Sequence, residues 1–389
     1  MKKIIIYNIL ILLLPLYLNS QTANTIKNEV NLDSLINSVK ILTNEISAPY
    51  VGTIRNRFSM NGRKSTAIFL KNKLLEFGLD ANLDSYRESG NNVIGFQEGV
   101  IYPDSIIIIG AHFDAVDEYC ADDNASGTSA VIEAARILSK YEFKYSIIYA
   151  FWDEEELGLI GSDYYAKRAA ANNKKILGVI NLDMIGYDGD DDGQCEVQYY
   201  GYTNLSYPEL KNNSLRLLKL LINTHKNNKF ELVLLPIGRS YSGSDHASFW
   251  SQGFGAIFLS EPYNGDFNPN YHTSDDRLDG FNLDFFHNIS GLAITTLFNL
   301  AELIDFSLLS NEVFIYPNPF ADNLELRVRN GDPIGSVRIY DVNSKIIYQT
   351  LTNQNKLTIE LNVKVGVYFI EVINNEGKRI IRKILKNQM

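Results

Sequence analysis

With 389 residues, of which 45% are hydrophobic and 21% charged, the chain is long enough for a catalytic domain and a smaller second domain, and its composition excludes disordered, collagen-like and polytopic membrane proteins. The formal net charge of −10 disfavours nucleic acid and anionic membrane surfaces as partners. Two cysteines cannot supply a four-thiolate zinc site or an iron–sulfur cluster, so any metal site must be built from His, Asp and Glu.

The N-terminal segment has the pattern of a secretory signal peptide. Lys2 and Lys3 precede an apolar run over residues 4–18, which is shorter than the ~20 residues that span a bilayer, and a polar stretch follows. We therefore predict a signal peptide over residues 1–20 and an exported mature chain with no integral membrane segment. The alternative reading of the apolar run is a retained membrane anchor.

Apolar periodicity predicts the elements of the central region. Apolar residues at helical spacing predict helices over residues 31–48 and 64–77. Continuous apolar runs then predict buried strands at residues 105–112, 146–152, 176–183 and 254–260. Further helical patterns occur at residues 127–140, 158–170, 208–225 and 283–303. This alternation predicts an α/β domain with a mixed, mostly parallel central sheet and helices on both faces.

Candidate metal ligands follow three of the predicted strands. Ligands of open α/β sheets gather at the carboxyl ends of strands, so these side chains are expected at one edge of the sheet. They are His112 and Asp114 after the first strand, Asp153 to Glu156 after the second and Asp183 after the third, with Asp122 and Asp123 between the first two strands and Tyr271 and His272 downstream. Carboxylates concentrated there would repel one another unless cations were bound. Nitrogen and oxygen donors without thiolates suit zinc, with cobalt or manganese as substitutes.

Each of these residues also has a structural explanation when it is considered alone. A histidine at a strand end is often a buried structural residue, and the acidic run Glu154–Glu156 has the pattern of a solvated surface. Asp122 and Asp123 can cap the helix that follows them, and Asp183 can be a turn residue. The prediction of a metal site therefore depends on their combination.

Six short segments occur in the order in which a known enzyme family has them. They are GAHFDAV, ADDNASG, FWDEEELGLIGS, NLDMIGY, SDHASFW and YHTSDD, within roughly residues 60–300. This set resembles the di-zinc aminopeptidases related to bacterial leucyl aminopeptidase, glutamate carboxypeptidase and the glutaminyl cyclases. The resemblance implies the zinc-peptidase fold and two zinc ions per chain.

The resemblance also implies two zinc sites that share one carboxylate. One site would use His112 and Asp183, the other Glu156 and His272, with Asp123 bridging both. This arrangement leaves positions for a bridging water whose pKa the metals would lower. Asp114 is expected to hold His112 in one tautomer.

Further roles follow from the same resemblance. Glu155, next to a ligand, is expected to be the general base, which leaves Glu154 as an expected surface residue. Tyr271 is expected to hydrogen-bond the oxyanion, and Tyr241 matches a tyrosine that has this role in another branch of the family. His246 is expected to support the site without binding metal.

Two features of the central region leave alternatives open. Cys120, where relatives usually have glycine, and Cys195 can form a disulfide in an exported protein, or both can stay free thiols. The acidic stretch at residues 188–192 can bind calcium or form a solvated loop, and it lacks the spacing of an EF-hand.

The C-terminal region differs in pattern from the rest of the chain. After a linker at residues 306–312, short alternating runs predict a small all-β sandwich domain over residues 313–389. The stretches VFIYPNPFADNL, VRIYDVNSKIIYQ and GVYFIEVINNEGKRIIRKILK resemble the C-terminal sorting domain of the type IX secretion pathway of Gram-negative bacteria. That resemblance implies passage through the periplasm to a secreted or surface-attached location, with the type IX machinery as partner. The alternative is an accessory binding or stabilising domain.

These observations predict an exported, zinc-dependent exopeptidase at residues 21–305. The most favoured activity is that of an aminopeptidase, which removes N-terminal residues from peptide substrates with Glu155 activating a metal-bridging water. Alternatives on the same scaffold are a carboxypeptidase, a glutaminyl-peptide cyclotransferase with one zinc, and a non-enzymatic binding module. The last would be expected to have lost ligands, and none is missing here.

Overall fold

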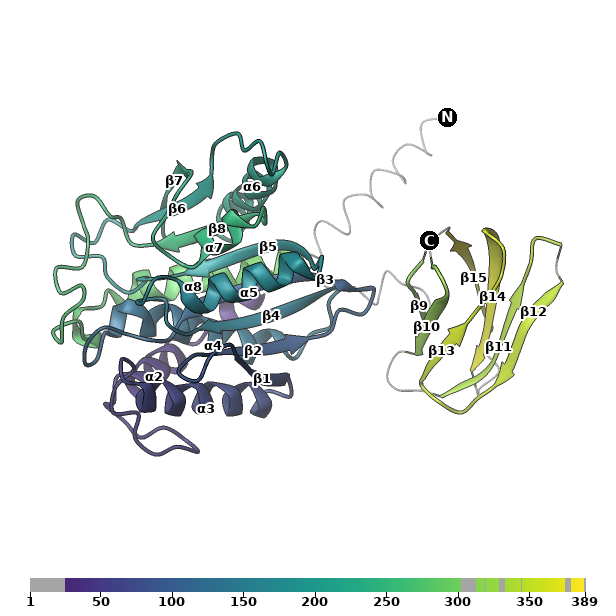
Figure 1. The fold of residues 1–389 in the computed structure, drawn as a ribbon, viewed down its shortest axis with the longest axis horizontal. Helices are drawn as coiled ribbons and strands as arrows, with labels where there is room; N and C mark the ends of the chain where they lie inside the picture. The colour runs from purple at the N-terminus through teal and green to yellow at the C-terminus, as the bar shows by residue number, and fades with distance from the viewer. Residues whose placement is uncertain are drawn as a thin grey trace. The chain divides into compact units, whose positions relative to one another are not determined.

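The computed structural model describes residues 25–301, 313–318, 320–328, 333–343, 345–374 and 379–387 (Figure 1). The predicted signal peptide at residues 1–20 and the predicted linker at residues 306–312 lie outside the described residues. The chain divides into two compact units, residues 1–98 with 104–303 and residues 99–103 with 304–389.

The first unit is built on a mixed sheet with the strand order β1-β2-β4-β3-β5-β8-β6-β7 (Figure 1). Its strands are β1 (Asp80–Ser85), β2 (Asn91–Gln97), β3 (Tyr102–His112), β4 (Tyr145–Trp152), β5 (Lys175–Leu182), β6 (Gln194–Tyr200), β7 (Val233–Arg239) and β8 (Ala256–Ser260). Pairing is parallel between β3 and β5, β5 and β8, and β6 and β7. It is antiparallel between β1 and β2, β2 and β4, and β6 and β8. The predicted mixed α/β sheet is confirmed, but β1, β2, β6 and β7 were not predicted.

Helices cover both faces of this sheet (Figure 1). They are α2 (Leu32–Leu42), α3 (Met60–Glu76), α4 (Gly127–Leu138), α5 (Ile160–Ala171), α6 (Leu210–Asn228), α7 (His246–Ser251) and α8 (Leu283–Ala301). Within the described part of the chain, none of the helices combines the length and apolar character that crossing a membrane requires.

Burial on both faces explains the continuous apolar runs of the sequence. Along β3, Ile107 and Ile109 belong to a core that α2, α3, α4, α6 and α8 share, whereas Ile106 and Ile108 belong to a second core with α5 and α7. A parallel strand covered on both faces needs apolar side chains at successive positions, and β3 supplies them.

Two helix ends differ from the predicted ones. Helix α2 ends at Leu42, short of the predicted residue 48, because Asn44 adopts a left-handed conformation with φ 64°. Helix α3 begins at Met60, before the predicted residue 64, because the Ser59 side chain accepts the backbone N–H of Gly62 and so caps the helix.

The second unit contains two antiparallel sheets, with the strand orders β13-β10-β9 and β12-β11-β14-β15. Its strands are β9 (Val313–Tyr316), β10 (Asn323–Val328), β11 (Ile334–Tyr340), β12 (Ile346–Leu351), β13 (Lys356–Glu360), β14 (Gly366–Asn374) and β15 (Arg379–Lys386). One core joins the two sheets, with Leu326 and Ile359 from the first and Ile339 and Ile370 from the second. The predicted all-β character of this region is confirmed.

The ends of the central strands of the first unit meet at one edge of its sheet. The Phe113 N–H donates to the Trp152 carbonyl at 2.9 Å, which joins the ends of β3 and β4. The Asp183 N–H donates to the Leu259 carbonyl at 3.3 Å, which joins the ends of β5 and β8. Between β3 and α4, the kinked turn at Ala121–Ser126 carries the predicted bridging carboxylate, and Asp123 itself has non-helical backbone angles (φ −101°, ψ 94°).

The turn after β4 is tightly packed against the start of α5, and this packing can be tested. A Cβ at Gly161 would lie 2.3 Å from the Asp153 carbonyl oxygen and 2.2 Å from Oδ1 of Asn92. We expect Gly161→Ala to lower the free energy of unfolding by about 1–3 kcal/mol, because backbone atoms must shift. Urea unfolding measures this loss.

The control for this prediction is Gly280→Ala, since a Cβ at Gly280 meets no atom within 4 Å. Equal unfolding free energies for the two variants would contradict the packing argument.

Candidate metal centre

The predicted ligands His112, Asp123 and Asp183 converge at the end of β3. Nε2 of His112 lies 3.2 Å from Oδ1 of Asp123 and 3.2 Å from Oδ1 of Asp183. Atoms bound at ~2 Å from one tetrahedral zinc lie about 3.3 Å apart, so these three side chains fit a common ion. All three are buried.

The other two predicted ligands lie on the opposite side of Asp123. Nε2 of His272 is 3.2 Å from Oδ2 of Asp123 and 3.2 Å from Oε2 of Glu156. Asp123 therefore presents one carboxylate oxygen to each histidine. This is the arrangement that a carboxylate bridging two metal ions requires, and the donor set fits zinc at both positions. The structure thus brings all five predicted ligands together, and their metal-binding role stays a prediction.

The predicted base lies beside these ligands. Carboxylate and imidazole atoms of His112, Glu155 and Asp183 lie within 4.8 Å of one another, as do those of His112, Asp123 and Glu156. A cavity of about 280 Å³ opens over them, with Met184, Tyr241 and Tyr263 among the residues of its wall. A small ligand in this cavity can therefore contact the base and the predicted ligands together.

The electrostatics of the cluster show an excess of negative charge. Burial, followed by the neighbouring Asp123 carboxylate, raises the pKa of Glu156 to about 8. Burial also raises the pKa of Glu155 well above its ordinary value. Burial alone would raise the pKa of Asp123 too, but hydrogen bonds with His112 and His272 outweigh it and lower that pKa. Two imidazoles do not balance these carboxylates, and divalent cations would.

Asp114 links the first histidine to the segment that carries the base. Its Oδ1 accepts the backbone N–H of Glu155 at 3.1 Å, and its Oδ2 accepts that of Glu156 at 3.2 Å. The same Oδ1 lies 3.4 Å from Nδ1 of His112. One buried carboxylate therefore contacts a ligand on β3 and both glutamates after β4, consistent with the predicted orienting role.

Sequence reasoning missed two residues that hold the predicted ligands. The Ser244 hydroxyl donates to Oδ2 of Asp183 at 2.7 Å. This serine lies in the SDH segment, which could have indicated its role. The Asp276 carboxylate accepts the backbone N–H groups of Asp122 and Asp123 at 3.0 Å each. Its signal was the second aspartate of the SDD segment, which the sequence analysis quoted without giving it a role.

The buried guanidinium of Arg57 was also missed. It donates to the carbonyl of Phe113 at 2.9 Å and to that of Cys120 at 2.6 Å, so it joins the end of β3 to the turn that carries Asp123. A lone arginine in a loop gave no sequence signal for this role.

The expectation that Glu154 lies on the surface is wrong. Its side chain is fully buried and accepts hydrogen bonds from Arg63 at 2.8 Å and from Tyr86 at 2.9 Å. Arg87 pairs with its second oxygen at 2.6 Å. These donors come from α3 and from the loop between β1 and β2, so Glu154 anchors the turn that precedes the base.

The two candidate tyrosines differ in their surroundings. Tyr271 is 40% exposed, and its ring stacks on His272 with the centroids 3.7 Å apart. Tyr241 is 81% exposed. Both line the cavity, and Tyr271 lies against a predicted ligand. His246 is buried, stacked on Phe258, and burial lowers its pKa to about 3, so it is a neutral packing residue.

The two cysteines are free and buried, so the disulfide between Cys120 and Cys195 is not present in this structure. Cys195 lies on β6 in the main core, and Cys120 lies in the turn before Asp123. Free thiols were the stated alternative.

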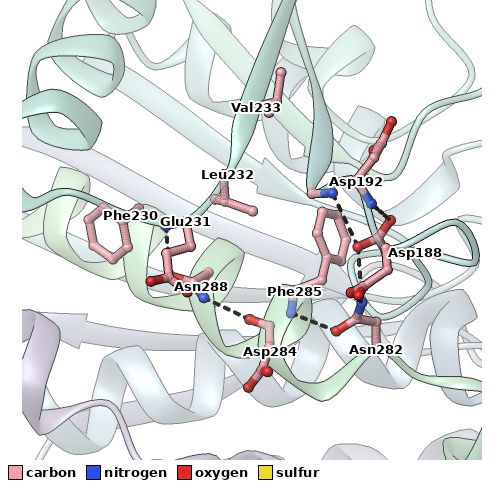
Figure 2. Close-up of a pocket in the computed structure, with 12 residues that line it drawn as sticks. Asp188, Asp192, Phe230, Glu231, Leu232, Val233, Asn282, Asp284, Phe285 and Asn288 are labelled. Carbon is pink, nitrogen blue, oxygen red and sulfur yellow. Dashed lines mark hydrogen bonds between the residues drawn. The ribbon is translucent and has the colours of Figure 1, made fainter.

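The acidic loop after β5 forms part of the wall of a second cavity, of about 450 Å³ (Figure 2). Its carboxylates at Asp188, Asp190 and Asp192 lie within 4.8 Å of one another. Asp188 accepts the backbone N–H groups of Asp192 and Gly193 and the side-chain amide of Asn282, at 3.0–3.3 Å. These hydrogen bonds hold Asp188 in place, and both alternatives for the loop, a calcium site and a solvated loop, stay predictions.

Comparison with known proteins identifies the family. A family model described as Peptidase family M28 matches residues 92–297, which include all the predicted ligands and the base. This chain belongs to peptidase family M28. A second model, described as Secretion system C-terminal sorting domain, matches residues 314–387. Both resemblances stated from the sequence are thereby confirmed.

Individual relatives support the same assignment. Leupeptin-inactivating enzyme 1 of Streptomyces exfoliatus is 30% identical over 244 residues, which are 57% of this chain and 51% of that protein. The chain therefore spans about half the length of this relative. The crystal structure of the Legionella pneumophila LapA aminopeptidase has 26% identity and a TM-score of 0.60, covering 72% of this chain and 75% of that one. Porphyromonas gingivalis glutaminyl cyclase, at 18% identity and a TM-score of 0.54 over 70% of this chain and 99% of its own, shares the fold.

The buried contacts of Glu154 predict a pH-dependent stability. Burial would raise its pKa, but hydrogen bonds led by that of Arg87 outweigh burial and lower it. Its stabilising contribution is therefore complete above the ordinary glutamate pKa of ~4.3 and is lost as the pH falls through the lowered value. We expect Glu154→Gln to lower the free energy of unfolding by about 1–3 kcal/mol at pH 7, and by less below pH ~4.

Urea unfolding at several pH values measures this difference. Glu88→Gln, at an exposed position of the same loop as Tyr86 and Arg87, is the matched control and should leave stability unchanged. A loss of stability in Glu154→Gln that does not depend on pH would rule out the charge as its cause.

Proposed function

We propose that this chain is an exported di-zinc aminopeptidase. The observation that carries the proposal is the position of Asp123, whose two oxygens each face one histidine, at 3.2 Å, with one further carboxylate beside each histidine. A site for one ion would not need this symmetry. One zinc would be held by His112, Asp123 and Asp183, and the other by Asp123, Glu156 and His272.

The metals and the protein side chains have separate tasks in this proposal. When bound, the zinc ions supply Lewis acidity, which polarises the scissile carbonyl and lowers the pKa of the attacking water. Glu155 takes the proton of that water and delivers it to the leaving amine. A carboxylate whose burial raises its pKa is suited to hold a proton between these two steps.

Tyr271 and Asp114 complete the proposed mechanism. The Tyr271 hydroxyl would donate a hydrogen bond to the oxyanion, since its ring packs on His272 at the cavity wall. Asp114 would fix the His112 ring and the backbone of Glu155, so that the base keeps its position relative to the ligands.

The cavity supports removal of terminal residues. Its volume of about 280 Å³ is at the small end for ligand pockets and suits one terminal residue better than an extended chain. The volume favours an exopeptidase, and the similarity to the Legionella pneumophila LapA aminopeptidase favours removal of the amino-terminal residue.

The sorting domain supports export. We infer that residues 314–387 direct the chain through the type IX secretion machinery to a secreted or surface-attached location. Peptides outside the cytoplasm would then be the substrates.

Metal content gives the first test of the proposal. We expect the purified chain to bind about two zinc ions, because each histidine faces one oxygen of Asp123 and one further carboxylate. Elemental analysis measures the ratio, and hydrolysis of aminoacyl p-nitroanilides should disappear with a chelator and return with zinc. A ratio near one would favour the cyclotransferase, and zinc binding without release from any aminoacyl substrate would favour a carboxypeptidase.

Adjacent glutamates give the second test. Glu155→Gln should lower kcat at least 100-fold with zinc content unchanged, because only the proton acceptor is lost. Glu156→Gln should lower zinc content, because a ligand is lost. Full activity of Glu155→Gln would refute the proposed mechanism.

A further inference from the structure

Strand β6 brings an acidic side chain to the edge of the sheet that carries the metal centre. Leu182 of β5 pairs with Leu259 of β8, so Asp183 follows at the level of Ser260. Ser260 in turn pairs with Glu196, because β6 runs antiparallel to β8. Asp183, Ser260 and Glu196 therefore form a row across three neighbouring strands. Neighbouring strands are ~4.8 Å apart, so Glu196 lies about 10 Å from Asp183.

Glu196 and Asp183 also share one face of the sheet. Asn181 and Asp183 both bind the Ser244 hydroxyl, which places them on the face that α7 covers. Phe258 pairs with both Asn181 and Gln198, and its ring stacks on His246 of α7. Gln198 and Glu196 are joined by a side-chain hydrogen bond, so Glu196 lies on this face as well.

Glu196 lacks a strong cationic partner. It is 2% exposed, and its hydrogen bond from the Gln198 amide measures 2.7 Å. Its contact with Arg239 is long, at 3.8 Å, and the arginine side chain is 42% exposed. Oε1 of Gln198 is buried and has no hydrogen-bond partner among the described residues. A buried carboxylate next to an unsatisfied acceptor favours a ligand that carries positive charge and several N–H donors.

Two residues of the cavity over the metal centre bear on a ligand that reaches toward Glu196. Tyr263 and Met184 line the wall of this cavity. Burial is the main cause that raises the pKa of the Tyr263 hydroxyl. Asp183, Tyr271 and Glu196 raise this pKa further, so Tyr263 lies within electrostatic reach of the carboxylates of Asp183 and Glu196.

We propose that Glu196 makes this enzyme select substrates whose N-terminal residue has a cationic side chain, lysine or arginine. The inference rests on the proposed aminopeptidase function. With the terminal residue at the metal centre, an aliphatic stem would pass Met184 and Tyr263, and the ammonium or guanidinium group would meet Glu196 and Gln198. A leucine side chain is too short to reach them. Arg239 partly neutralises Glu196 and competes with the substrate cation.

Matched substrates isolate the charge from the length of the side chain. Lysyl and norleucyl p-nitroanilides share an unbranched carbon stem and differ at its end by the ammonium group. For the zinc-loaded full chain we expect kcat/KM to favour the lysyl substrate 10- to 100-fold, the effect of one charge-assisted contact. In Glu196→Gln this ratio should fall at least tenfold. A ratio near one in the unaltered protein, or an equal ratio in the variant, would overturn the proposal.

Two further variants guard against indirect effects. Glu209→Gln, at an exposed position before α6, makes the same acid-to-amide change and should keep the ratio. Arg239→Met keeps Glu196 and removes its competitor, so the ratio should rise. A fall in that variant would overturn the proposal even if Glu196→Gln proved unstable.

Binding of free amino acids separates this proposal from the proposed function. L-lysine should raise the melting temperature of the unaltered chain more than L-norleucine does, and Glu196→Gln should remove the difference. That result without hydrolysis of any aminoacyl substrate would refute the aminopeptidase and still support a cation site at Glu196. Equal effects of the two amino acids would refute the site, whatever the activity.

Discussion

The position of Asp123 between two histidines is the constraint on which the rest of the first unit depends. A carboxylate can face two imidazoles only if its backbone is held firmly, and the surrounding residues do this. Asp276 accepts the Asp123 N–H, and Arg57 binds one carbonyl at the end of β3 and another just before the turn. The strands then supply the partners, with His112 at the end of β3 and Asp183 after β5. The sheet therefore fixes distances that a loop alone would not.

Electrostatic repulsion is the cost of this arrangement. Glu155, Glu156, Asp123 and Asp183 lie close together with little access to water, and two imidazoles offset only part of their charge. The chain belongs to peptidase family M28. The imidazole nitrogens and carboxylate oxygens of its site are donor atoms that bind a divalent metal such as zinc. The fold tolerates the repulsion because large apolar cores lie on both faces of the sheet.

The sequence predicted much of the fold and of the candidate site, and the exceptions have physical reasons. Strands with continuous apolar runs, such as β3, were predicted because both of their faces are buried. Strand β6 was missed because Glu196 and Gln198 interrupt its apolar pattern. The five candidate ligands were found because each follows a strand or lies in a recognisable segment. The burial of Glu154 could not be predicted, since its partners Arg63 and Arg87 are distant in the chain.

The contacts of Asp114 have a mechanical consequence. One carboxylate binds the N–H groups of two successive glutamates and lies against the ring of His112, so it ties these three groups to one another. A displacement that carried Glu155 away from the centre would also carry Glu156 and tilt His112. The turn after β4 is therefore coupled to the end of β3 through a single side chain, although the two segments are about forty residues apart in the chain.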